Sequence, residues 1–141
     1  MMMAFDGWRR LVGIEGMDQR RPRSITIVAA LMIIFGAAEV ATGFSHRFLG
    51  LHIAQGEVST YLGAGVGVLY AAAGLLVLTM RRRAALLAIA FLIVVVAGRI
   101  LMVTTGFYPI NTLQQAAAIA IGTAIVVAFA FFIGSKMSVF R

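Results

Sequence analysis

The sequence predicts an all-α integral membrane protein: a bundle of four transmembrane helices with both termini on the cytoplasmic side. The first observation is composition, because 62% of the 141 residues are hydrophobic and the mean hydropathy is +1.00. Soluble domains are about 45–50% apolar. One domain of this length cannot hide such a surplus in its own core, so lipid must cover much of it.

The second observation is that the apolar residues fall into four runs, at residues 25–44, 61–80, 84–105 and 112–134. Each run holds about 20 residues, enough for a helix to cross a hydrocarbon core of roughly 30 Å. None alternates with period two, which argues against the strands of a membrane barrel. We therefore expect a basic segment at 1–24, a four-helix membrane domain at 25–134 and a short tail at 135–141.

The third observation is the placement of the basic residues. If four helices alternate in direction, ten of the 12 Lys and Arg residues share one side of the membrane. The loops on the opposite side contain only Arg47. Cytoplasmic loops carry such an excess of positive charge, so we expect a multi-pass protein of the inner (cytoplasmic) membrane. The ten residues are Arg9, Arg10, Arg20, Arg21, Arg23, Arg81, Arg82, Arg83, Lys136 and Arg141.

Local signals suggest where the helices begin and end. Ser24 is a candidate N-cap for the first helix, and Pro109 is expected to stop the third. Asn111, with Gln114 three residues later, predicts a capping box for the fourth helix.

Two spans carry small residues at every fourth position, which favours close packing of helices in lipid. The second run has Gly63, Gly67 and Ala71, and the fourth has an alanine stripe at Ala116, Ala120, Ala124 and Ala128. Such stripes usually pack within the bundle, and two separate stripes leave room for one inside the bundle and one between protomers. A homo-oligomer or a membrane protein complex is therefore compatible with the sequence.

Two charged residues interrupt the apolar runs. Glu39 lies 14 residues after Ile25, and Arg99 lies 15 residues after Ala84. Both helices would run outward from the cytoplasm, so both charges would lie about 21–23 Å from the inner boundary. A lone charge at this depth is normally paired or faces a wet cavity. The matched depths predict an ion pair between the first and third helices.

Other polar residues are expected near this depth and complete the candidate ligand site. Gly65 and Gly67 would leave space beside the pair, and the site would open toward the outer face. Two interpretations remain open: a buried staple that fixes helix register, or a small-molecule or proton site. The candidate residues are Glu39, Arg99, Thr42, His46, Tyr70, Gln114 and Gln115.

Several function classes find no support. There is no cysteine, so thiolate chemistry and Cys-ligated metals are excluded. His46, His52 and Glu57 lack a standard metal-ligand spacing, so we predict no metal site. No serine or threonine has an evident base beside it, and we name no catalytic residue. The chain lacks a basic stripe with interleaved aromatics, so we expect no nucleic-acid partner.

Part of the chain, about residues 61–110, resembles the DoxX-like group of small four-helix membrane proteins. The likeness rests on Tyr61-Leu62-Gly63, Gly74-Leu75-Leu76-Val77-Leu78, the basic turn at 81–83, Ala97-Gly98-Arg99-Ile100 and Gly106-Phe107-Tyr108-Pro109. It implies the four-helix architecture and draws attention to Arg99. Most members have no assigned function, and some are tied to oxidoreductase or respiratory membrane complexes.

We therefore expect a non-enzymatic membrane protein organised around Glu39 and Arg99. It would act as an accessory or scaffold subunit, or bind a lipid or quinone-like hydrophobic molecule. The alternative is a small proton-coupled transporter that uses Glu39. A fixed arginine favours the ionised carboxylate, which makes Glu39 a poor proton carrier near neutral pH. The sequence names no cofactor.

Overall fold

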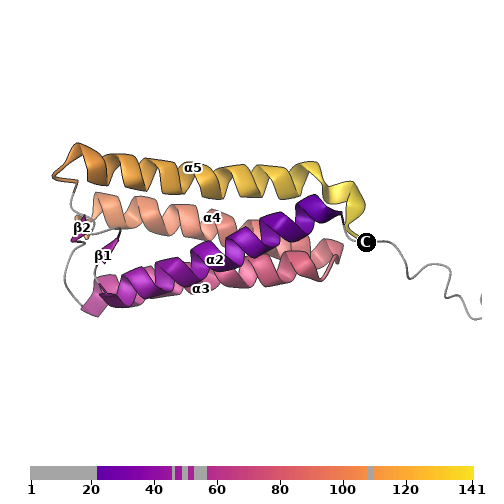
Figure 1. The fold of residues 1–141 in the computed structure, drawn as a ribbon, viewed down its shortest axis with the longest axis horizontal. Coiled ribbons are helices and arrows are strands. Elements are labelled where there is room, and N and C mark those ends of the chain that lie inside the picture. The colour runs from indigo at the N-terminus through magenta and orange to yellow at the C-terminus, as the bar shows by residue number, and fades with distance from the viewer. Residues whose placement is uncertain (1–21, 46, 49–50, 53–56, 108–109) are drawn as a thin grey trace, which may run out of the picture.

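A computed structural model describes residues 22–45, 47–48, 51–52, 57–107 and 110–141. These residues form four long helices: α2 (Arg23–Ser45), α3 (Glu57–Leu78), α4 (Arg82–Thr104) and α5 (Leu113–Ser135) (Figure 1). Two short strands, β1 (Arg47–Phe48) and β2 (Leu51–His52), pair antiparallel between α2 and α3. The 3₁₀ turn η2 (Met137–Val139) follows α5. The predicted four-helix architecture is confirmed.

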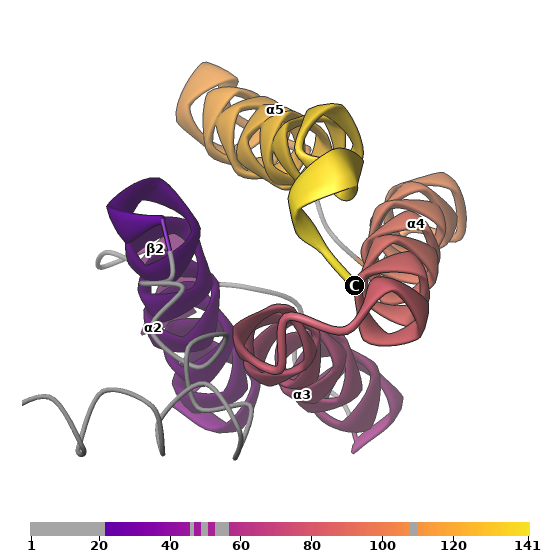
Figure 2. The same cartoon turned by 90° about the vertical axis from the view of Figure 1, so that its right-hand side faces the viewer.

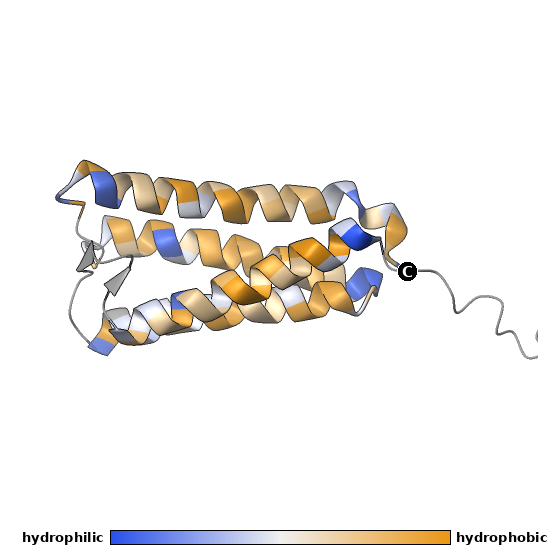
Figure 3. Cartoon of the chain, viewed as in Figure 1, coloured by the Kyte–Doolittle hydropathy of each residue, from blue (hydrophilic) through white to orange (hydrophobic). Residues whose placement is uncertain are grey.

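All four long helices of the described chain are long and apolar enough to cross a membrane. Large apolar side chains point outward from the bundle; Leu113 is 86% exposed and Phe131 78% exposed. Apolar residues line the helices, and polar ones gather near the bundle ends (Figure 3). Lipid can cover these outward side chains, so the structure fits a small multi-pass membrane protein.

The helices follow one another around the bundle in chain order (Figure 2). One end of the bundle carries the β1–β2 pair and the connection between α4 and α5 (Figure 1). The other end carries the start of α2, the α3–α4 turn and the last residues of the chain. We call these the strand end and the basic end, because exposed Arg81, Arg82, Arg83 and Lys136 lie at the latter.

The closest packing joins α2 to α3 through glycines on both helices. A Cβ placed on Gly36 would lie 2.5 Å from the backbone nitrogen of Ala71 and 2.7 Å from the carbonyl oxygen of Gly67. A Cβ on Gly43 would lie 2.8 Å from the Ala64 nitrogen. Such small residues let two backbones touch, which supplies packing energy where lipid gives apolar burial little value. The predicted stripe on the second span therefore packs inside the bundle.

The alanine stripe on the fourth span behaves differently. Ala120, Ala124 and Ala128 are exposed on α5, while the fully buried residues of this helix are Val126 and Ile133. This stripe therefore does not pack within the bundle. Larger side chains, not alanines, face the core, so α5 sits against its neighbours with little backbone contact.

Three helix ends lie at other residues than the sequence predicted. Thr112, not Asn111, caps α5: its side chain accepts from the backbone of Gln115, whose Oε1 accepts from the Thr112 backbone at 3.3 Å. Gly106 ends α4, because it adopts φ +78 directly after the C-cap Thr105. That left-handed conformation suits glycine and stops the helix before Pro109, which lies outside the described residues. Ser24 lies inside α2, which begins at Arg23.

The chain end is tied to the α3–α4 turn. The Arg82 nitrogen donates to the Arg141 carbonyl oxygen at 2.5 Å, and the Arg141 nitrogen donates to the Met80 carbonyl oxygen at 3.1 Å. Phe140 inserts its side chain into the core and is 4% exposed. The last residues of the chain therefore pack against the basic end of the bundle.

Replacing Gly36 by alanine should separate α2 from α3. The added methyl group would meet backbone atoms that cannot move independently, so we expect a loss of about 1–3 kcal/mol in the free energy of unfolding. Denaturation in mixed micelles, followed by circular dichroism, measures this change.

Gly65→Ala is the matched control, since a Cβ at Gly65 meets nothing within 4 Å. This variant should be neutral or gain up to about 1 kcal/mol from helix propensity. Equal effects at the two positions would contradict the packing role of Gly36.

Candidate functional site

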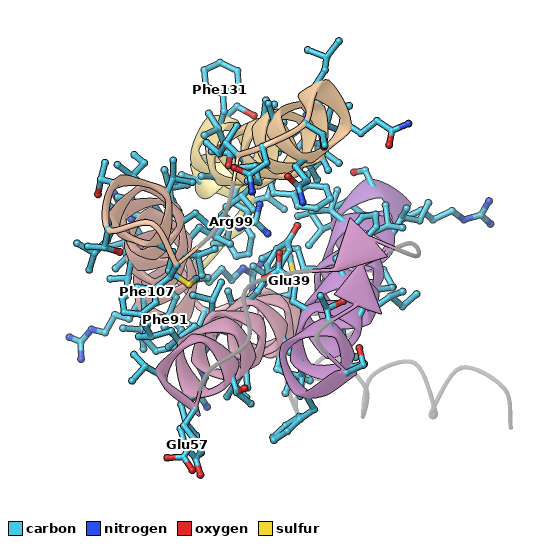
Figure 4. The ribbon with its side chains drawn as sticks, turned by 90° about the vertical axis from the view of Figure 1, so that its left-hand side faces the viewer. Glu39, Glu57, Phe91, Arg99, Phe107 and Phe131 are labelled. Atoms are coloured by element: carbon cyan, nitrogen blue, oxygen red, sulfur yellow. The ribbon has the colours of Figure 1, made fainter. Side chains whose placement is uncertain are left out.

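The centre of the candidate site is the meeting of Glu39 and Arg99. Glu39 projects from α2 and Arg99 from α4, and both side chains turn toward the bundle interior (Figure 4). Arg99 Nη2 contacts Glu39 Oε1, with the two side chains 13% and 20% exposed respectively. The structure thus brings together the two charges that the sequence placed at the same depth.

A glycine on α5 makes room for the guanidinium group. A Cβ placed on Gly122 would lie 2.8 Å from Arg99 Nη1. Any larger residue at this position would push the arginine away from its place. Gly122 was missed in the sequence, where the one available signal was a glycine interrupting the middle of the last apolar run.

Tyr70 of α3 lies in the core of the bundle. It is 2% exposed, and its ring centroid is 6.2 Å from that of Phe129 on α5. The Phe129 ring in turn lies 6.5 Å from Phe35 on α2. Three rings from three helices therefore form an aromatic cluster, defined as Phe35, Tyr70 and Phe129, inside the same bundle.

The register of α2 and α3 sets the level of Tyr70 relative to Glu39. Gly36 touches Ala71, so Tyr70 begins nearly level with Gly36 and about one helical turn from Glu39. Side chains on a helix tilt toward its N-terminus. Because α2 and α3 run in opposite directions, Glu39 and Tyr70 tilt toward each other along the bundle.

Two buried polar atoms in this region lack a hydrogen-bond partner among the described residues: Glu39 Oε2 and the Tyr70 hydroxyl. Buried polar groups are nearly always satisfied in native proteins, and each exception needs a reason. An unpaired group away from water costs about 1–3 kcal/mol. The core thus holds two polar atoms that a bound molecule can satisfy.

Other predicted site residues lie elsewhere or serve the fold. Gln115 belongs to the capping box of α5, and Gln114 is exposed at the strand end. Gln114 precedes Gly122 by two turns, which places it about 12 Å from the level of Arg99. Thr42 is half-buried on α2, one turn beyond Glu39. His46 lies outside the described residues.

The glycines expected to leave space beside the pair do not do so. A Cβ on Gly67 would lie 2.7 Å from both the Gly36 oxygen and the Val40 nitrogen. Gly65 is exposed on the outside of α3. Gly67 is thus used for helix contact and Gly65 faces outward, so the space that they were expected to provide is absent at both positions.

The chain matches no family model, no curated protein and no solved structure. The site must therefore be interpreted from its own geometry. Its elements are a contact between opposite charges, an aromatic cluster, and two buried atoms that can form further hydrogen bonds.

Replacing Tyr70 by phenylalanine should raise stability when no ligand is bound. The change keeps the ring and removes a buried hydroxyl that lacks a partner in the described structure. We expect a gain of about 1 kcal/mol in the free energy of unfolding, measured by denaturation in micelles.

Tyr61→Phe is the control on the same helix, because Tyr61 is 72% exposed. It should leave stability unchanged. A loss of stability in Tyr70→Phe would show that the buried hydroxyl already has a partner in the protein.

Proposed function

We propose that this protein is a non-enzymatic integral membrane protein that binds a lipid or quinone-like hydrophobic molecule at Glu39, Arg99 and Tyr70. The observation that supports this function is a pair of buried atoms, Glu39 Oε2 and the Tyr70 hydroxyl, that have no partner within the described part of the chain. A purely structural staple gains nothing from leaving them unsatisfied. A polar head group offers each of them a partner, while an apolar tail suits the surrounding core.

An ion pair between Glu39 and Arg99 inside the membrane forms part of this proposal. The contact between Arg99 Nη2 and Glu39 Oε1 supports it. Removing one member of a buried pair leaves an uncompensated charge, which is strongly destabilising. The pair would hold α2 and α4 in register and keep the site electrically neutral.

The ion pair predicts coupled effects of two substitutions. Glu39→Gln and Arg99→Leu should each lower the free energy of unfolding by about 3 kcal/mol. The double variant should recover at least about 1 kcal/mol of the summed loss, measured by denaturation in micelles.

The exposed Glu57 and Arg83 supply matched controls. We expect little change in the free energy of unfolding from Glu57→Gln or Arg83→Leu. The change in the double variant should equal the sum of the two single changes. Strict additivity at Glu39 and Arg99 would rule out the ion pair.

The binding function predicts a molecule that travels with the protein. Protein extracted from its own membrane in mild detergent should carry a lipid or quinone-like compound, identified by mass spectrometry after organic extraction. We expect Tyr70→Phe, which keeps the fold and the charges, to reduce its amount several-fold.

Tyr61→Phe should retain the wild-type amount. Equal amounts in wild type and Tyr70→Phe would contradict a site at this tyrosine, and extracts without any such compound would refute the binding function.

A second candidate function is proton-coupled transport through Glu39. Its supporting observation is that one carboxylate oxygen of Glu39 is unpartnered within the described structure and so open to a proton or a cation. Proton release from protein in liposomes on addition of cationic substrates, lost in Glu39→Gln, would favour it over binding alone. The arginine beside the carboxylate opposes this function, because its positive charge repels a second cation at the site.

We also propose an orientation for the protein in the membrane. Grouping of Arg81, Arg82 and Arg83 with the chain end at one end of the bundle supports a cytoplasmic basic end and inner-membrane insertion. A reporter fused to the C-terminus should report the cytoplasm; an external signal would reverse the orientation. The exposed alanines of α5 leave a surface for a second protomer or another membrane protein, which fits an accessory role.

A further inference from the structure

We infer that the head group bound at this site is neutral and donates a hydrogen bond, as a hydroxyl or amide N–H of a membrane-soluble molecule does. This inference rests on the proposed binding function and names the chemistry of its ligand. It separates two classes that the proposal leaves together: head groups that can donate, and head groups that carry only carbonyl or ether oxygens.

The need for a donor follows from Glu39 Oε2. An ionised carboxylate accepts hydrogen bonds and donates none. The other oxygen, Oε1, contacts Arg99, so Oε2 is the atom with remaining capacity in the described structure. A ketone, quinone, ester or ether oxygen is itself only an acceptor, so it would leave Glu39 Oε2 without a donor.

The Tyr70 hydroxyl can form a hydrogen bond with the same ligand group that donates to Glu39. It can both donate and accept, so it can complete a hydrogen bond with the oxygen of a ligand hydroxyl. Because Glu39 and Tyr70 start about one turn apart and tilt toward each other, one small head group can face both. A ligand O–H would then donate to Glu39 Oε2 while its oxygen accepts from Tyr70.

Charge selects a neutral head group. The Glu39 and Arg99 charges cancel, so no net charge remains for a ligand ion to balance. An ionic head of either sign would leave a net charge in a setting of low dielectric, which is costly.

The aromatic cluster indicates where the apolar part of the ligand lies. Phe35 is 39% exposed on the side of α2, its ring is 6.5 Å from that of Phe129, and Phe129 is 6.2 Å from buried Tyr70. The rings therefore lead from the lipid-facing surface to the buried hydroxyl. A tail along this path keeps its contact with lipid while the head reaches the core.

The test uses two probes that differ in one hydrogen-bond donor: a long-chain 4-alkylphenol and its O-methyl ether. Binding of radiolabelled probe is measured with the full chain in nanodiscs of phosphatidylcholine, against empty nanodiscs. We expect the phenol to bind at least about tenfold more tightly than the ether, because the ether leaves Glu39 Oε2 unpaired.

Two matched pairs of variants locate the binding. Tyr70→Phe should weaken phenol binding about tenfold, whereas Tyr61→Phe should not change it. Phe35→Ala should weaken both probes, whereas Phe131→Ala, at a 78% exposed position on α5, should weaken neither. Unfolding of each variant, measured in parallel, ensures that a loss of binding is not a loss of fold.

Equal affinities for phenol and ether would overturn the inference, since no donor would then be required. So would phenol binding that survives Tyr70→Phe, or occupation of the site by a bound water alone. Absence of binding by both probes also overturns it. The proposed function is judged separately by the compound that co-purifies: a carbonyl-only molecule lost in Tyr70→Phe would leave that function standing and refute the donor requirement.

Discussion

Direct contact between the backbones of α2 and α3 is the constraint on which the rest of the structure depends. Glycines at Gly36, Gly43 and Gly67 permit an approach that a single methyl group would prevent. The contact fixes how far α2 is shifted along α3. That shift places Glu39 about one turn from Tyr70. The glycine contacts between α2 and α3 therefore determine the geometry of the candidate site.

Periodicity and hydropathy were sufficient to predict the four helices, because a membrane span needs length and apolar character more than any particular residue. The similar level of Glu39 and Arg99 along the bundle was also predictable, since the level follows from counting residues along straight helices. The ends of α4 and α5 were harder. Two adjacent residues, Asn111 and Thr112, can each cap a helix, and Gly106 stops α4 before the proline that looked decisive.

The interior of the site could not be predicted, because rotation about a helix axis decides which residues face inward. The alanine stripe of α5 looked like a packing surface, yet larger residues such as Val126 turn to the core. Gly67 was expected to leave room and instead touches Gly36. Gly122 gained its meaning only when α5 was placed beside α4, where it accommodates the guanidinium of Arg99.

The light packing of α5 has a consequence for the motion of the molecule. The α2–α3 pair is locked by backbone contact, while α5 turns its alanines outward and buries Val126 and Ile133 fully. Segments with few buried contacts open at the lowest free energy. We therefore expect α5 to move away from the bundle at the strand end, while Phe140 and the turn after α3 hold it at the basic end. Exchange of its amide hydrogens would be fastest toward the strand end, and a bound molecule would slow it.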